Sequence, residues 1–312
     1  MCGQEATTRT APARRVVGAG ILGLALSLTA ASASAQIEVL EEITVTAQKR
    51  EQTLADVPLS VNAITGEAVN DYLNGGQDIR ALAARVPGLN IETSNGRTQP
   101  RFYLRGLGNI DFDVNANQPV AMVFDEIALE NNVLRSLPLF DIARVEVLKG
   151  PQGSLFGRNT NAGAIKIDSV RPGQDIDGYV RAAYGVRDTI AVEGAANLPA
   201  SETFSTRVSL KYQERGDWID NVVNGPGDDF GSFEELAWRV QFAWTPTDNF
   251  AGLLKLHGFN QDGSQPQVFY ANAIEQGSPG LRPGFDEEIA RHDNDVADLT
   301  LDHIRAALNL QW

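Results

Sequence analysis

Apolar and polar side chains alternate strictly along several stretches in the second half of the chain. In residues 204–213 one side of the pattern reads Phe, Thr, Val, Leu, Tyr and the other reads Ser, Arg, Ser, Lys, Gln. Residues 235–245 and 303–312 show the same alternation. A repeat of two residues places the two sets on opposite faces of an extended strand. These stretches therefore predict β-strands with one apolar and one polar face.

About six such segments follow residue 173. They are residues 179–187, 190–198, 204–213, 235–245, 250–257 and 303–312. Strands of about ten residues with an apolar outer face and aromatic residues near their ends are typical of outer-membrane β-barrels. A soluble β-sandwich also alternates, but it buries its apolar face against a second sheet. We therefore predict the first strands of an antiparallel transmembrane β-barrel.

The strand count predicts that this barrel is incomplete. Barrels that enclose an internal domain have about 22 strands, so six would belong to a fragment or a truncated gene. Such a sheet has two unpaired edges, and we expect residues 1–312 alone not to form a closed, functional barrel.

The lengths of the connections predict an orientation, because periplasmic turns are short and outer loops are long. Residues 198–203 and 246–249 are short connections, whereas residues 216–234 and 258–302 are long. The second long loop is rich in Asp and Glu and includes His292. Oxygen-rich loops can hold calcium, but no ligand spacing is recognisable, and we predict a solvated acidic loop without metal.

The N-terminus has the order of features found in a secretory signal peptide. A basic start precedes the apolar residues 16–30 and then Ala33-Ser34-Ala35, which predicts cleavage after Ala35. The apolar run is too short to be a spanning helix. The single cysteine, Cys2, lies before the predicted cleavage site. The mature chain is therefore expected to lack disulfides and cysteine metal sites.

Charge and composition exclude several functions. The chain has 26 Lys and Arg against 40 Asp and Glu, a net charge of -14, so it is a poor ligand for nucleic acid. No histidine occurs before His257. With no cysteine left after cleavage and no catalytic constellation, we predict no enzyme activity and no cofactor.

Residues 51–172 predict a small α+β domain. Strands are expected at 89–92, 101–106, 120–125 and 144–148. Residues 78–86 have apolar residues at three- and four-residue spacing and are followed by Pro87-Gly88, which predicts a short helix. Strands separated by one helix and long connections favour this fold class.

The most distinctive motif is RVEVLKGPQGSLFGRN at residues 144–159. A strand with two different faces leads into a glycine-rich turn, where the chain is expected to cross closely against other backbone. A phosphate-binding loop is disfavoured, because no GK[ST] follows and the next segment, 164–168, reads as a strand. The motif resembles the plug-domain signature of TonB-dependent outer-membrane receptors, and Leu104-Arg105-Gly106 resembles a second motif of that family. The resemblance implies structural roles for Arg105, Gly106, Glu146, Lys149, Gly150, Gly153, Gly157 and Arg158.

Residues 41–47, EEITVTA, form a short β-prone run just after the predicted cleavage site. An extended, otherwise unpaired segment can add as a strand to the edge of a partner sheet. An ordinary edge strand or a flexible tail is the alternative. The run resembles the TonB box of the same family, which implies binding to TonB and its inner-membrane energising complex through Glu42, Ile43, Thr44, Val45, Thr46 and Ala47.

Two polar regions of the α+β domain are candidates for ligand contact. Arg97 and Arg101 either attract an anionic ligand or pair with carboxylates on the inner barrel wall. Residues 111–118 form either a second ligand-facing loop or a solvated connection. The candidate ligand contacts are Asn95, Arg97, Gln99, Arg101, Asn115, Asn117 and Gln118.

The sequence therefore predicts four regions: a signal peptide (1–35), a periplasmic tail with the TonB box (36–50), a plug domain (51–172) and barrel strands (173–312). The resemblance implies active uptake of a small extracellular ligand, such as a ferric siderophore or a similar metal complex. The expected location is the outer membrane of a Gram-negative bacterium, in contact with its lipid. A passive porin or surface receptor and a nonfunctional remnant are the alternatives.

Overall fold

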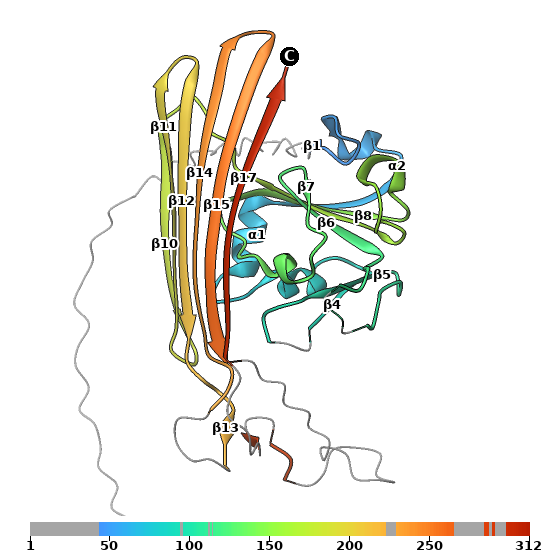
Figure 1. Cartoon of the computed structure of the whole chain (residues 1–312), viewed down its shortest axis with the longest axis vertical. Helices are drawn as coiled ribbons and strands as arrows, with labels where there is room; N and C mark the ends of the chain where they lie inside the picture. The colour runs from blue at the N-terminus through green and yellow to red at the C-terminus, as the bar shows by residue number, and fades with distance from the viewer. Residues whose placement is uncertain are drawn as a thin grey trace, which may run out of the picture. The chain divides into compact units, whose positions relative to one another are not determined.

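Six long antiparallel strands form a single sheet, here called the long sheet (Figure 1). In spatial order they are β10 (Asp177–Gly185), β11 (Thr189–Ser201), β12 (Phe204–Arg215), β14 (Phe233–Thr247), β15 (Phe250–Ser264) and β17 (Asp298–Gln311). All six predicted segments are confirmed as strands. Several strands extend beyond their predicted ends, because backbone pairing continues past the apolar stretch. Phe233 at the start of β14, for example, still pairs with Gly263 of β15.

The computed structural model describes residues 44–93, 96–111, 113, 115–222, 229–264, 284–286, 289–290 and 298–312. These residues all belong to one unit, Glu42–Trp312. Within this described part, no helix is both long enough and apolar enough to cross a membrane. Most of the acidic loop with the candidate calcium ligands lies outside the described residues.

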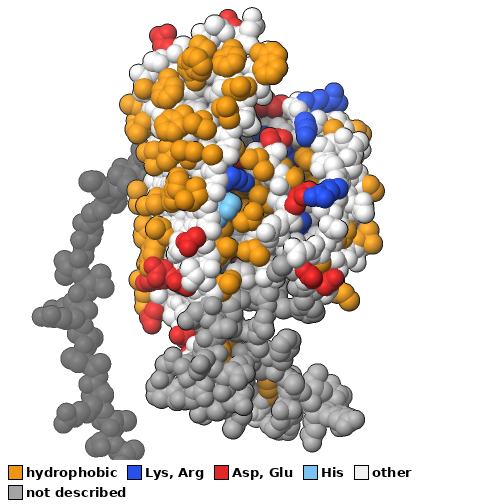
Figure 2. All heavy atoms as spheres, viewed as in Figure 1, with side chains coloured by type: hydrophobic (Ala, Val, Ile, Leu, Met, Phe, Trp, Pro, Cys, Tyr) orange, Lys and Arg blue, Asp and Glu red, His pale blue; other side chains and the backbone are white. Residues whose placement is uncertain are grey.

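The two faces of the long sheet differ as the alternation predicts. Val208, Leu210 and Leu236 are exposed on one face, whereas Arg207 and Gln241 are buried on the other. Figure 2 shows rows of hydrophobic side chains over these strands. The polar face contacts a second, smaller body of the chain through ion pairs of Arg207, Glu235 and Lys255.

This smaller body is built on a five-stranded sheet, here called the mixed sheet. Its order is β3 (Ser60–Thr65), β8 (Ile142–Lys149), β9 (Gly163–Ser169), β6 (Val120–Phe124) and β7 (Ile127–Ala128), with β6 and β9 parallel. Helix α1 (Gly66–Leu73) packs on β8, and β4 (Leu89–Glu92) pairs with β5 (Arg101–Leu104). Shorter elements are β1 (Thr44–Val45), β2 (Gln52–Thr53), η1 (Leu54–Asp56), η2 (Ile79–Ala84), η3 (Val133–Ser136), α2 (Gly153–Phe156), β13 (Asp220–Asn221) and β16 (Ile289–Ala290).

The predicted strands of this region are confirmed, but the helices differ. Residues 78–86 contain the 3₁₀ helix η2, not an α-helix, and its buried Ile79 and Leu82 lie three residues apart. The longer of the two described α-helices is α1, which the sequence did not predict. Its eight residues bury Val69 and Leu73, too few positions to give a clear helical repeat.

Strand β8 is buried on both faces, which explains its pattern. Val145 and Val147 belong to the main apolar core, while Leu148 packs in a second cluster with Val45 and Val57. Glu146 shares the face of Leu148 and is fully buried. The charged position in the motif is therefore covered by the N-terminal segment.

The glycines of the motif have different roles. Gly150 and Gly157 have φ of 107° and 78°, in the left-handed region that favours glycine. The prediction for Gly153 was wrong, because it lies in α2 and an added Cβ would come no closer than 3.9 Å to another atom. The close crossing occurs instead at Gly163, where a Cβ would lie 2.1 Å from the carbonyl oxygen of Leu148.

Candidate functional site

The N-terminal segment is docked on the mixed sheet. Thr44 and Val45 form β1 and pair with β2, and Val45 and Ala47 are completely buried. Val45 and Ala47 belong to the cluster that contains Leu148. The expectation that this segment is unpaired is therefore wrong for the described part, because its apolar side chains find a site on the mixed sheet. Glu42 and Ile43 lie outside the described residues.

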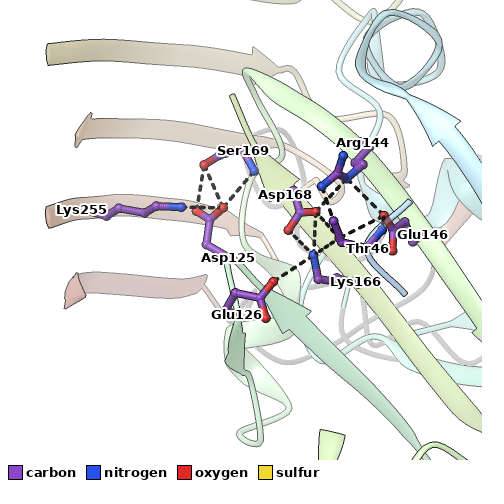
Figure 3. A network of polar contacts seen from close by, with 9 residues as sticks. All are labelled: Thr46, Asp125, Glu126, Arg144, Glu146, Lys166, Asp168, Ser169 and Lys255. Atoms are coloured by element: carbon purple, nitrogen blue, oxygen red, sulfur yellow. Dashed lines mark hydrogen bonds and ion pairs between the residues drawn. The ribbon is translucent and has the colours of Figure 1, made fainter. Parts of the chain in front are cut away.

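Thr46 is held by polar contacts between these two apolar anchors (Figure 3). Its amide donates a hydrogen bond of 2.7 Å to Oε1 of Glu146. Its hydroxyl accepts hydrogen bonds from Nζ of Lys166 at 2.7 Å and from Nη2 of Arg144 at 3.2 Å. Through its backbone amide and its hydroxyl, a single threonine thus contacts side chains of both β8 and β9.

The charged groups around Thr46 are paired with one another. Lys166 lies 2.6 Å from Asp168 and 3.0 Å from Glu126, and Arg144 lies 2.9 Å from Asp168 and 3.1 Å from Glu146. Burial raises the pKa of Glu146, although the Thr46 amide and the two cations act in the opposite direction. We call these five charged residues with Thr46 the box network.

Asp125 connects the mixed sheet to the long sheet immediately beside this network. Its carboxylate accepts hydrogen bonds from the amide and hydroxyl of Ser169 and lies 2.9 Å from Nζ of Lys255 on β15. Burial alone would raise the pKa of Asp125, but Lys255 and Arg239 outweigh burial and lower it. Figure 3 shows Lys255 reaching this carboxylate from the long sheet.

Asp141 forms a second contact between the sheets. Its fully buried carboxylate accepts hydrogen bonds of 2.8 Å and 2.6 Å from the guanidinium of Arg207 on β12 and a third from the hydroxyl of Ser209. Two-pronged pairing of this kind fixes orientation as well as distance.

Arg97 forms a third contact of this type. Its Nε lies 2.7 Å from Glu235 on β14, and its guanidinium stacks 3.8 Å from the Phe233 ring. Burial would lower the pKa of Arg97, but Glu235 and Asp78 outweigh it and raise the pKa. For Arg97, this geometry favours pairing with the barrel wall over attraction of a ligand. Arg101, the second arginine considered, lies at the start of β5.

The other candidate ligand contacts are scattered. Asn95 lies outside the described residues, and Gln99 has a left-handed φ of 52°. The Asn115 amide donates to Asp113, and the Asn117 carbonyl accepts from Asn109. Gln118 is buried, and its side-chain atoms have no hydrogen-bond partner among the described residues.

Apart from the buried Glu146, several of the candidate structural residues lie at turns and surface contacts. Arg105 and Gly106 have φ of 52° and 81°, as expected of a tight turn after β5. Lys149 donates a hydrogen bond of 2.6 Å to the carbonyl of Pro87. Arg158 pairs with Glu130 on the surface.

The sequence reasoning missed Lys166, Asp168, Asp125 and Asp141. A signal existed for the first two, because Lys166 and Asp168 alternate with Ile165 and Ile167 and so share one face of a predicted strand. No local pattern marks Asp141, whose partner Arg207 is 66 residues away.

Comparison with known proteins agrees with this architecture. Residues 53–164 match the family model of the TonB-dependent Receptor Plug Domain. The chain is 28% identical over 236 residues to the pesticin receptor of Yersinia pestis, an alignment that covers 73% of this chain and 33% of the relative. It is also 28% identical to a vitamin B12 transporter of Vibrio vulnificus, over 82% of this chain and 39% of that protein. Residues 53–164 are therefore similar to the plug domain of TonB-dependent receptors, and the longer alignments carry this likeness into the strands that follow.

Solved structures of TonB-dependent receptors share the fold. The ferric yersiniabactin uptake receptor of Yersinia pestis superposes with a TM-score of 0.67 at 21% identity, covering 81% of this chain and 38% of that one. The ferripyoverdine receptor of Pseudomonas aeruginosa gives a TM-score of 0.67 at 18% identity, covering 86% and 34%. The chain spans about a third of the length of its first curated relatives. These likenesses bear out the predicted fold class of a plug with barrel strands, and they agree with the predicted outer-membrane location.

Proposed function

We propose that the protein is an outer-membrane receptor for active uptake of a ferric siderophore or a similar metal complex. The observation that carries this proposal is the docked segment 44–47, a β-prone strand held on the plug by contacts that can be exchanged for contacts with a partner. One relative is named a ferric aerobactin receptor of Klebsiella pneumoniae, and it is 26% identical over 60% of this chain.

Release of the docked segment is the step that would make TonB binding possible. Thr46 donates its amide to Glu146, and Val45 and Ala47 are buried against the plug. A partner strand needs the same backbone groups. In this proposal ligand binding outside shifts the segment toward its free form, and TonB, driven by its inner-membrane complex, then pulls on it. The chain itself performs no catalytic step.

A passive porin is less consistent with this structure. The polar face of the long sheet is occupied by the plug through Asp141, Arg97 and Asp125. A diffusion pore needs that face open to water. The box network would also have no purpose in a pore that needs no energy.

Proline substitution tests the strand-pairing step. Val45→Pro in the native gene removes the amide donor of Val45 and should abolish uptake of the iron complex that supports growth, while surface binding of that complex remains. Val45→Ala is the matched control, since it also shortens the buried side chain but keeps the amide. Unimpaired uptake by Val45→Pro protein at normal surface levels would rule out strand pairing.

A further inference from the structure

The polar face of the long sheet carries an excess of positive charge where it meets the plug. Four basic residues line this part of the wall: Arg207, Arg239, Lys255 and Arg305. Two buried plug carboxylates, Asp125 and Asp141, face them. The other inner carboxylates have different partners, because Glu235 pairs with Arg97 and Glu193 accepts from Tyr179.

Several donors of this wall are buried without an acceptor. Arg239 is 1% exposed, and its Nε and Nη1 have no hydrogen-bond partner among the described residues. Its Nη2 donates to the carbonyls of Phe140 and Asp141, and the nearest carboxylate oxygen of Asp141 is 3.7 Å away. Leaving such a donor unsatisfied costs about 1–3 kcal/mol, more for a charged group. The guanidinium also stacks on the Phe140 ring at 4.5 Å, but an aromatic face supplies no acceptor for these two donors.

Arg305 and His257 extend the same region. The guanidinium of Arg305 lies 5.0 Å from the centre of the Phe124 ring and makes no ion pair with any described residue. His257 is buried and stacks on Phe124 at 5.7 Å, and neither of its ring nitrogens has a partner among the described residues. These groups surround the end of β6, where Asp125 follows Phe124.

We propose that this wall, Arg207, Arg239, Lys255 and Arg305, is a track for a solute that bears oxyanion groups. Asp125 and Asp141 occupy the track in the resting state as built-in counter-charges. When the plug rearranges, the oxyanions of the cargo replace these carboxylates one after another. Guanidinium groups suit this task, because they bind oxyanions with two parallel hydrogen bonds and remain charged. The inference rests on the proposed uptake function and adds the charge class of the cargo.

A cavity lies next along the track, on the side of the docked segment. It has a volume of about 720 Å³ and is lined by Leu253 and Asn309 of the long sheet, by Thr46 and Glu126 of the box network, and by Arg171. Leu253 and Lys255 are two residues apart on β15 and so share a face. Withdrawal of the docked segment would remove one wall of this cavity. The track would then continue into an opening made by the same movement that TonB drives.

Anion rescue tests the wall without any transport assay. Asp125→Asn and Asp141→Asn are made separately in the product of the native gene, and thermal unfolding is measured in detergent with inorganic phosphate or with KCl at equal ionic strength. Each substitution should lower the unfolding midpoint, and phosphate should restore at least half of the loss for Asp125→Asn, because it supplies the missing counter-charge. Adding Lys255→Gln to Asp125→Asn should remove this rescue. If phosphate restores no more than KCl in either variant, or if neither variant can be refolded in phosphate, the anion track is wrong.

Transport tests the cargo. Arg305→Gln has no ion pair to break and should fold normally, yet uptake of the iron complex that supports growth should fall severalfold while surface binding is kept. Arg85→Gln, an exposed plug arginine that stacks on Tyr72, is the control and should transport normally. Normal uptake by Arg305→Gln would overturn the cargo assignment. Both variants are made in the native gene. If the unaltered product of that gene takes up no iron complex, the proposed function fails instead, and the phosphate result still decides whether the wall binds anions.

Discussion

At the scale of single residues, Thr46 is the position on which docking of the N-terminal segment depends most. Thr46→Val keeps the shape but removes the hydroxyl that accepts from Lys166 and Arg144. Loss of these hydrogen bonds should weaken the free energy of docking by about 1–3 kcal/mol. The undocked fraction then rises roughly 5- to 150-fold. Trypsin cleavage after the exposed Lys49 or Arg50 measures this fraction and should accelerate accordingly.

The matched control for this substitution is Thr53→Val. The hydroxyl of Thr53 donates only to Asp56 at the surface, so its removal should change the cleavage rate little. Equal acceleration in both variants would mean that the hairpin opens as a whole and that the box network does not hold it.

The raised pKa of Glu146 predicts that the free energy of unfolding depends on pH. Because burial raises its pKa above the value of 4.5 for a free glutamate, the folded state favours the protonated form. The free energy of unfolding therefore gains a contribution as the pH falls through the raised pKa toward 4.5, and this contribution is lost again as the pH rises. Glu146→Gln keeps an acceptor for Thr46 and should remove this dependence.

Urea titrations at several pH values measure the difference between the two proteins. Asp125 contributes a pH dependence of the opposite sign, which Asp125→Asn should remove. The pKa of Asp125 lies below 3.8, so its contribution to the free energy of unfolding is lost as the pH falls below that value. Parallel stability curves for wild type and Glu146→Gln would show that Glu146 does not titrate in this way.

At the scale of elements, the contact between α1 and β8 leaves no room for a side chain. A Cβ added to Gly66 would lie 1.9 Å from the carbonyl oxygen of Ile142. Gly66→Ala should therefore destabilise the plug by about 1–3 kcal/mol or more in urea unfolding. Gly153→Ala, which has space in α2, should be neutral or slightly stabilising, by about 0.4–1 kcal/mol. A similar loss in both variants would contradict this packing.

The elements that the sequence could predict are those whose pattern is local. Strands β12 and β14 alternate over ten residues or more, and one apolar face is enough to identify each of them. Helix α1 has only eight residues, and the docking of Val45 and Ala47 depends on a surface formed by Leu148, about a hundred residues later. Such long-range packing leaves no periodic signal in the segment itself.

At the scale of the whole molecule, the plug and the long sheet are joined by buried charges of opposite sign. From the sequence, pairing of plug arginines with carboxylates of the barrel wall was one of two alternatives. Arg97 and Glu235 form such a pair. The reverse arrangement, plug carboxylates on barrel cations at Asp141 and Asp125, was not predicted. Composition gives a net charge of -14, which conceals a cationic inner wall. Only the fold shows which charges face each other.

The outer face of the long sheet leads to a prediction for the molecule in its membrane. Val208 lies in the middle of β12, pairs with Ala196 and Val240, and is exposed on the apolar face. Val208→Lys should raise the free energy of the folded state in phosphatidylcholine vesicles by about 2–4 kcal/mol, because a lysine at the bilayer midplane loses its hydration. Val186→Lys, in the exposed turn between β10 and β11, is the control and should cost about 0–1 kcal/mol. Guanidinium titration of the vesicle-bound protein measures both. If the two lysines cost the same, this face of the sheet does not lie in the hydrocarbon core.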